Sequence, residues 1–424
     1  MRFFATCAKG TEGALRRELS ALKLRHVRGG QGGVAFEGGL EAAMRACLHA
    51  RVAMRVVLEL ASFPADDADA LYEGVRAVDW TPWLTARTTL AVEATVRDSG
   101  ITHSGFAALK VKDAVVDALR DKLGARPDVD PKDPDVRIVL HLSRDQADLG
   151  LDLAGEPLHK RGYRSGMTPA PLKETLAAAV LALGGVGLER PFIDPMCGSG
   201  TLAIEHALAA RKIAPGLGRS FGFQRWPSYR GELQSKWDRM KEEARRAALP
   251  AAPAPIVARD LFSKALDAAR RNAAAAGVGQ DIRFEKGDVR DLAPDAAMAA
   301  GTICTNPPYG ERLMGREVGR EARREVGREK GRGGPGGAGR EKQVKRLARG
   351  SDAPPDRRAE HVSQLKLQGL YRGMAEAMAR FHGWSAVFLS GNAFLEQAMH
   401  VKPQVSHRLW NGPLEVKLLK YRMR

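Results

Sequence analysis

A glycine-rich turn, Asp194-Pro195-Met196-Cys197-Gly198-Ser199-Gly200-Thr201, lies between an apolar strand over Pro191–Asp194 and a helical segment over Leu202–Ala210. Glycines in such a turn let backbone N–H groups come close to a bound ligand. Ligands of open α/β sheets bind at the carboxyl ends of the strands. The order strand, turn, helix therefore predicts a ligand site directly after the first strand of a parallel sheet.

The same order recurs along the rest of the chain. Helical segments separate four further apolar strands, predicted at Ile256–Asp260, Ile282–Glu285, Thr302–Thr305 and Ser385–Ser390. Such alternation predicts parallel strands joined by crossover helices, which is a doubly wound sheet. The last two strands, Val405–Trp410 and Glu415–Tyr421, flank Asn411-Gly412-Pro413 and predict a closing antiparallel hairpin.

The glycines alone leave the ligand of the turn open, because Gly198-x-Gly200-x-x-Ala203 also fits the loose dinucleotide fingerprint. A dinucleotide enzyme has its ribose-binding acid about twenty residues further on, whereas the next strand here ends much later, at Asp260. Asp194 would repel a phosphate and favours a cationic amino-acid ligand. Asp260 could accept hydrogen bonds from two ribose hydroxyls, and Asp288 one from an adenine amino group. Either could instead be a helix N-cap.

The segment Asn306-Pro307-Pro308-Tyr309 follows the fourth strand. An exocyclic amine on a base is a poor nucleophile, because its lone pair is delocalised into the ring. Two acceptors that hold its hydrogens can free that lone pair for attack on a sulfonium methyl group, and the Asn306 amide oxygen and the Pro307 carbonyl suit this role. The prolines restrict the backbone, and Tyr309 offers a ring on which an extruded base can stack. We therefore predict that residues 306–309 are catalytic.

The N-terminal 157 residues form two smaller α+β units. Helices are predicted over Thr11–Leu22, Glu41–Leu48 and Ser104–Leu123, and strands over Val34–Glu37, Leu90–Val96, Val136–Leu142 and Gln146–Leu153. We expect this half to supply a basic, RNA-binding surface. The expected RNA-binding residues are Lys110, Lys112, Lys160, Arg161 and Arg164.

The composition indicates a polyanionic partner, and it gives no sign of a membrane-spanning segment or a metal site. The 424 residues carry a net charge of +17 and a pI near 9.9, which favours nucleic acid. The longest apolar run, Leu176–Leu183, is too short to cross a bilayer. Four scattered cysteines have no metal-ligand spacing. We expect a cytoplasmic protein with free thiols and without a metal.

One segment, residues 315–360, departs from the alternating pattern. It repeats Gly-Arg-Glu around a GRGGPGG core, and residues 315–350 hold twelve Lys/Arg and five Glu. Burial of these few apolar residues cannot offset the conformational entropy that the segment would lose on folding. We therefore expect a disordered insertion. A tolerated surface insertion is favoured over a role in gripping RNA.

Together these motifs resemble a known family. Asn306–Tyr309 with Asp194–Thr201 is similar to the class I S-adenosylmethionine-dependent methyltransferases that act on amino groups. The resemblance to bacterial 23S rRNA guanine-N2 methyltransferases extends over nearly the whole chain. It rests also on Gly32–Phe36, Lys110–Asp117, Lys160–Arg164, Ala170–Ala179, Asn306–Leu313 and Asn411–Leu414.

The resemblance implies an α/β fold: a Rossmann-like methyltransferase domain preceded by α+β ferredoxin-like and THUMP domains. The implied bounds are 1–57 for the ferredoxin-like domain, 58–157 for THUMP, 158–170 for a linker and 171–424 for the methyltransferase domain. The implied partner is 23S rRNA or a large-subunit assembly intermediate. The implied S-adenosylmethionine-binding residues are Thr175, Asp194, Pro195, Cys197, Gly198, Ser199, Gly200, Thr201, Asp260, Asp288 and Asn306.

Other readings stay open. Asn-Pro-Pro-Tyr also serves adenine-N6 methylation of DNA and glutamine-N5 methylation of protein, and THUMP domains also bind tRNA, so a tRNA guanine is an alternative target. A non-catalytic RNA-binding protein with a methyltransferase-like fold is a further alternative. Many members of the family continue into a second methyltransferase domain. Because this sequence stops at Arg424, we expect it to lack that second activity.

Overall fold

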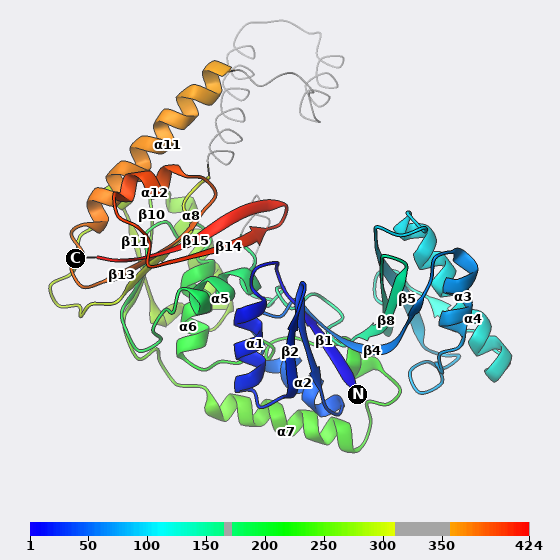
Figure 1. The fold of residues 1–424 in the computed structure, drawn as a ribbon. Helices are drawn as coiled ribbons and strands as arrows, with labels where there is room; N and C mark the ends of the chain where they lie inside the picture. The colour runs from blue at the N-terminus through cyan, green and yellow to red at the C-terminus, as the bar shows by residue number, and fades with distance from the viewer. Residues whose placement is uncertain (165–171, 310–356, 424) are drawn as a thin grey trace, which may run out of the picture.

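The computed structural model describes residues 1–164, 172–309 and 357–423, and the side chains of the last range from residue 364 (Figure 1). Within them the strands form one eight-stranded and one seven-stranded sheet. The expected insertion at 315–360 lies almost wholly outside the described residues. So do Gly310–Leu313 and residues 165–170 of the expected linker.

The eight-stranded sheet joins the two N-terminal units. Its order is β2-β3-β1-β4-β8-β7-β5-β6, and β4 pairs antiparallel both with β1 and with β8. The elements are β1 Arg2–Thr6, α1 Glu12–Ala21, β2 Arg25–Gly30, β3 Gly33–Glu37, α2 Leu40–His49, β4 Arg55–Pro64, α3 Ala68–Arg76, β5 Thr89–Arg97, α4 Ser104–Leu123, β6 Asp128–Val129, β7 Val136–Ser143 and β8 Gln146–Asp152. One sheet thus runs through both units.

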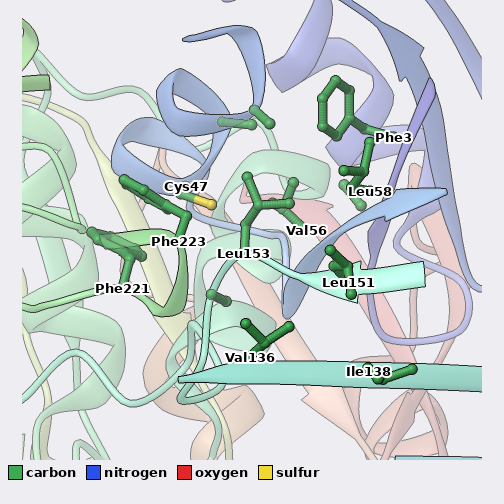
Figure 2. Packing of buried hydrophobic residues seen from close by; sticks show 14 of the residues in the cluster. Phe3, Cys47, Val56, Leu58, Val136, Ile138, Leu151, Leu153, Phe221 and Phe223 are labelled. Atoms are coloured by element: carbon green, nitrogen blue, oxygen red, sulfur yellow. The ribbon is translucent and has the colours of Figure 1, made fainter. Parts of the chain in front are cut away.

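Apolar side chains that alternate along these strands build the N-terminal core. Phe3, Val56, Leu58, Val136 and Ile138 are almost fully buried (Figure 2). Phe221 and Phe223, from the second half of the chain, pack into the same core and stack on each other with ring centroids 5.5 Å apart. The two halves therefore share apolar packing.

The seven-stranded sheet carries the candidate site. Its order is β11-β10-β9-β12-β13-β15-β14; the strands from β11 to β13 are parallel, and β15 pairs antiparallel with both β13 and β14. The strands are β9 Phe192–Asp194, β10 Ile256–Asp260, β11 Ile282–Lys286, β12 Thr302–Thr305, β13 Ser385–Ser390, β14 Val405–Asn411 and β15 Leu414–Arg422. The helices are α5 Glu174–Leu183, α6 Thr201–Ala210, η1 Gly222–Arg225, α7 Glu232–Ala247, α8 Ser263–Ala275, η2 Gly279–Asp281, η3 Val289–Asp291, α11 Arg357–Met378 and α12 Phe394–Met399.

This sheet confirms the predicted doubly wound topology and closing hairpin. Counted from β9, the strand order is 3-2-1-4-5 followed by the hairpin, and it reverses direction between β9 and β12. Such a switch point is where ligands bind in open α/β sheets. The carboxyl ends of β9 and β12 therefore frame the candidate site.

Arg51 and Lys9 of the N-terminal half also contact the second half. Arg51 Nη2 donates to the carbonyls of Leu208 and Ile213, at and just beyond the end of α6, at 3.3 and 2.7 Å. The Lys9 ammonium lies 4.0 Å from the ring centre of Trp410 on β14.

Among the described helices, none is long and apolar enough to span a membrane.

Candidate active site

The turn after β9 is held open by two glycines in left-handed conformations. Gly198 has φ +56° and Gly200 has φ +84°, which other residues adopt only at a cost. A Cβ atom on Gly198 would meet no atom within 4 Å, whereas one on Gly200 would lie 3.0 Å from the Cβ atom of Ala269. Gly200 thus permits close packing against α8, and Gly198 leaves room above the turn.

The rest of the turn is fixed by backbone hydrogen bonds. The Cys197 N–H donates to the Arg259 carbonyl at 2.9 Å, and the Ser199 carbonyl accepts from Asn272 Nδ2 at 3.0 Å. Pro195 lies between Asp194 and Met196, and Thr201 begins α6. The turn is therefore tied both to β10 and to α8.

Asp194 is a buried carboxylate at the mouth of this turn, with 1 % of its surface exposed. Its Oδ1 accepts from the Thr305 hydroxyl at 2.8 Å and from the Met196 N–H at 3.3 Å. Burial raises the pKa of Asp194 to about 7, and these two hydrogen bonds only partly oppose the shift. Among the described residues no cation pairs with it, so a cationic ligand group would be a favourable partner.

Asp260 holds the turn from β10. Its Oδ2 accepts from the Gly198 N–H and its Oδ1 from the Phe262 N–H, both at 2.9 Å. A carboxylate oxygen can accept two hydrogen bonds, so each keeps one position for a ligand hydroxyl. Beside it Leu261 and Phe262 are about half exposed, at 49 % and 46 %. Sequence reasoning missed these two apolar side chains, although their position next to Asp260 could have singled them out.

Asp288 lies beyond the end of β11 and caps the short helix η3. Its Oδ1 accepts from the Arg290 N–H at 2.9 Å, and its two oxygens accept from the Arg290 guanidinium at 3.0 and 2.6 Å. These hydrogen bonds lower the pKa of Asp288. The N-cap alternative is thus realised, while Oδ2 keeps one acceptor position.

Residues 306–309 follow β12, beside the glycine-rich turn. Thr305, 0 % exposed, links the two motifs through its hydrogen bond to Asp194; its role was also missed. The Tyr309 hydroxyl donates to Asn306 Oδ1. Pro307 is buried, and Asn306, Pro308 and Tyr309 are partly exposed. The structure therefore brings the predicted catalytic segment and Asp194 to one place.

The basic run after residue 159 is used largely inside the protein. The Arg161 side chain is 4 % exposed; its guanidinium donates to the Leu158 and Arg51 carbonyls and lies 3.6 Å from Glu205. Arg164 pairs with Glu174 at 2.9 Å and donates to the Thr201 hydroxyl at 3.3 Å. For Arg161 the structure corrects the expectation of an RNA contact, because its charge is buried among protein groups.

Thr175 and the predicted RNA-binding lysines lie elsewhere. Thr175 is 2 % exposed in the first turn of α5. On α4, Lys110 pairs with Asp69 at 3.3 Å, and Lys112 with its neighbour Asp113. Lys160 pairs with Glu156, and its side chain is 58 % exposed. The lysines remain accessible, but each has an acidic partner.

The charge of the N-terminal half corrects another expectation. Residues 1–57 hold ten Lys/Arg and four Asp/Glu, whereas residues 58–157 hold eleven and nineteen, so this half is not basic as a whole. Exposed basic side chains of this half gather on α1, on β2 and in the turn between them. We call Arg16, Lys23, Arg25 and Arg28 the β2 cluster. The Arg16 side chain passes beside Gly29 of β2. Within the described residues none of the four forms a salt bridge.

Comparison with known families matches three consecutive parts of the chain. The RlmL ferredoxin-like domain matches residues 2–57, the THUMP domain residues 65–152, and the RMKL-like methyltransferase domain residues 161–332. The methyltransferase part of the chain is thus similar to the RMKL-like methyltransferases. The three matches agree with the predicted family resemblance and confirm the predicted architecture of a methyltransferase domain behind ferredoxin-like and THUMP domains.

Curated relatives align with nearly all of this chain. It is 41 % identical over 432 residues to the ribosomal RNA large subunit methyltransferase K/L of Syntrophotalea carbinolica, covering 99 % of this chain and 53 % of the relative. The protein of that name from Pseudomonas paraeruginosa is 39 % identical, covering 98 % and 52 %. The chain thus spans about half the length of these relatives.

Solved structures share the fold of this chain. The crystal structure of SMU.472 in complex with SAH matches with a TM-score of 0.80 and 27 % identity, over 100 % of this chain and 98 % of that one. A Listeria monocytogenes protein named, by prediction, an N6-adenine-specific DNA methylase matches with a TM-score of 0.79 and 27 % identity, over 100 % and 96 %. Both matches span the N-terminal and the methyltransferase parts.

Proposed function

We propose that the chain transfers the methyl group of S-adenosylmethionine to the exocyclic N2 of a guanine in 23S rRNA. The observation that carries the proposal is the hydrogen bond between Thr305 and Asp194. It joins a buried carboxylate without a cationic partner among the described residues to the amide and prolines of residues 306–309. A site for a cationic amino-acid ligand and a site for an amino group thus share one edge of the sheet.

The residues around the turn fit S-adenosylmethionine. Asp194 would pair with the ammonium group of its methionine part, which offsets the burial of the carboxylate. The free acceptor positions of Asp260 suit two ribose hydroxyls, and the half-exposed Leu261 and Phe262 suit the apolar faces of an adenine. We propose that Asp288, Thr175 and residues 195–201 complete this site. When bound, the cofactor supplies an electrophilic methyl group on a sulfonium.

Residues 306–309 would bind and orient the target base. Asn306 Oδ1 and the Pro307 carbonyl would accept the two hydrogens of the guanine amino group and direct its lone pair toward the methyl group. An amide oxygen has two acceptor positions, so Asn306 can hold the base while it accepts from the Tyr309 hydroxyl. The methylated nitrogen then loses one proton to water, because the cationic product is acidic. No strong general base is needed.

RNA is the acceptor that the domain composition favours. The chain has a THUMP domain, and relatives named ribosomal RNA large subunit methyltransferase K/L align with nearly all of it. The fold shared with a protein named as an adenine DNA methylase keeps DNA as the alternative to be tested. We propose that Lys110, Lys112, Lys160 and the β2 cluster contact the RNA backbone, in the cytoplasm. The domain bounds 1–57, 58–157 and 171–424 are part of the proposal.

A transfer assay with labelled S-adenosylmethionine tests the proposal. The purified chain is offered 23S rRNA, tRNA, duplex DNA and a protein acceptor in parallel, and the modified residue is identified by mass spectrometry. We expect N2-methylguanine in 23S rRNA. If the label appears in adenine, in tRNA or in glutamine, the labelled acceptor becomes the assigned substrate in place of a guanine in 23S rRNA. Absence of cofactor binding in calorimetry would favour a non-catalytic RNA-binding protein.

A further inference from the structure

The backbone of residues 306–309 is tethered by side chains that come from far along the chain. Pro307 and Pro308 have no N–H group, so this segment can be tied down mainly through its carbonyl oxygens. Two of these carbonyls accept hydrogen bonds, from the end of β13 and from α11. The contacts cross the stretch 310–356, so nothing in the local sequence around Asn306 reveals them.

The first tether is Tyr371 on α11. Its side chain is fully buried, with 0 % of the residue exposed, and its hydroxyl donates to the Pro308 carbonyl at 2.8 Å. Leu367 and Met374, on either side of Tyr371 along α11, are buried in the same apolar core. Because α11 is packed in this way, the Tyr371 hydroxyl has a fixed position. The peptide that follows Pro308 is thereby held against α11.

The second tether is Asn392, directly after β13. Its Nδ2 lies 3.5 Å from the Tyr309 carbonyl and 3.4 Å from the Tyr371 hydroxyl, to both of which it can donate. Its Oδ1 accepts from the Phe394 N–H at 3.0 Å, and this contact directs the Nδ2 group toward residues 308–309. Next to it a Cβ atom on Gly391 would lie 2.6 Å from Cγ of Tyr309. The Tyr309 ring therefore rests directly on backbone at Gly391.

We infer that Tyr371 and Asn392 are positioning residues that fix the Pro307 carbonyl and the Asn306 side chain for the incoming amino group. The inference rests on the proposed function. Within the described residues, the Pro308 and Tyr309 carbonyls are tied to these two side chains, while no donor reaches the Pro307 carbonyl. The tethers thus hold the segment on both sides of Tyr309 and leave the acceptor that faces the base free.

The test compares two tyrosine variants that differ in this one respect. Tyr371→Phe removes a hydroxyl that donates to the Pro308 carbonyl and can accept from Asn392, whereas Tyr421→Phe removes a buried hydroxyl that has no hydrogen-bond partner in the described structure. Tyr371 and Tyr421 are 0 % and 1 % exposed, so the two variants remove hydroxyls from comparably buried side chains. Asn392→Asp gives a third variant, which loses the Nδ2 donor and keeps the acceptor for Phe394.

We expect Tyr371→Phe and Asn392→Asp each to lower kcat by roughly three- to tenfold, the effect of one ordinary hydrogen bond. The cofactor Kd measured by calorimetry should stay within about twofold, and Tyr421→Phe should keep wild-type kcat. Wild-type kcat in Tyr371→Phe overturns the inference while the proposed function stands. Equal losses of kcat and cofactor binding would also overturn it, since they indicate a general structural role. A wild-type chain that methylates no acceptor sinks both proposals.

Discussion

At the scale of the residue, Asp194 is a carboxylate in a place that disfavours its charge. Loss of solvation raises its pKa from 3.8 to about 7, and the nearby Asp260 adds to the shift. A carboxyl group with a higher pKa in the folded than in the unfolded chain binds protons more tightly when folded. Its contribution to the free energy of unfolding is therefore fully present at low pH and is lost as pH rises from about 4 to about 7.

Asp194→Asn should remove this pH dependence. Without cofactor, the variant should be more stable than the wild type at pH 8, where the buried wild-type carboxyl is charged. At pH 5 the wild-type carboxyl is largely protonated, so the difference in stability should be much smaller. A shift from 3.8 to about 7 corresponds to roughly 4 kcal/mol at most. Thermal denaturation at the two pH values measures the difference. A gap of the same size at both would show that the Asp194 carboxyl does not titrate in this range.

Asn306 is the residue on which the proposed methylation of the base depends. Asn306→Ala removes the amide acceptor and should lower kcat by roughly ten- to a hundredfold, the effect of a hydrogen bond of about 1.5–3 kcal/mol. Cofactor affinity should change little, since Asp194 and Asp260 keep their contacts. Single-turnover transfer and calorimetry measure the two quantities. Tyr309→Phe separates the two contacts of Oδ1, because it keeps this acceptor and removes only the hydroxyl that donates to it. Unchanged kcat in Asn306→Ala would exclude this residue from the reaction.

At the scale of the element, the amphipathic and apolar patterns predicted most of the secondary structure. β10, β12 and β13 have the predicted bounds, because each is a short apolar strand ended by a polar residue. The pairing of β4 with both β1 and β8 had no local signal, since it depends on contacts between distant strands. The same holds for Tyr371 and Asn392, and for Arg161, whose basic run is typical of an exposed surface although the structure buries it.

The end of α6 depends on a side chain from the other half of the chain. The last carbonyls of a helix lack intrahelical donors, and Arg51 supplies donors to Leu208 and Ile213. Arg51→Met should remove these hydrogen-bond donors and the positive charge beside the buried Glu18 and Glu205. We expect this loss to lower the free energy of unfolding by about 2–4 kcal/mol. Urea denaturation measures the loss. Arg45→Met is the control: Arg45 forms an exposed pair with Glu41 at 3.4 Å, worth at most about 0.5 kcal/mol. Equal midpoints for the two variants would contradict a bracing role for Arg51.

At the scale of the whole molecule, charge is distributed unevenly among the parts that match different families. The part at 1–57 is basic, the part at 58–157 is acidic, and residues 158–424 hold 46 Lys/Arg and 27 Asp/Glu. In the proposed function, RNA therefore approaches a chain whose THUMP part carries net negative charge. Electrostatic attraction should come from the ferredoxin-like and methyltransferase parts, which pack together through Arg51 and through Lys9 and Trp410.

The β2 cluster should accordingly contribute to RNA affinity through phosphate contacts. Arg25→Gln with Arg28→Gln removes two exposed charges from an edge strand, where no hydrophobic packing is lost. Each phosphate contact contributes roughly 0.7–0.9 to the slope of log affinity against log salt, so the slope should fall by about 1.5 and affinity should drop most at low salt. The matched control, Arg87→Gln with Arg126→Gln, removes two exposed charges from the acidic part and should change the slope less. Arginines that only shield the edge of the sheet from other strands would leave both the affinity and the slope of the Arg25/Arg28 variant at wild-type values.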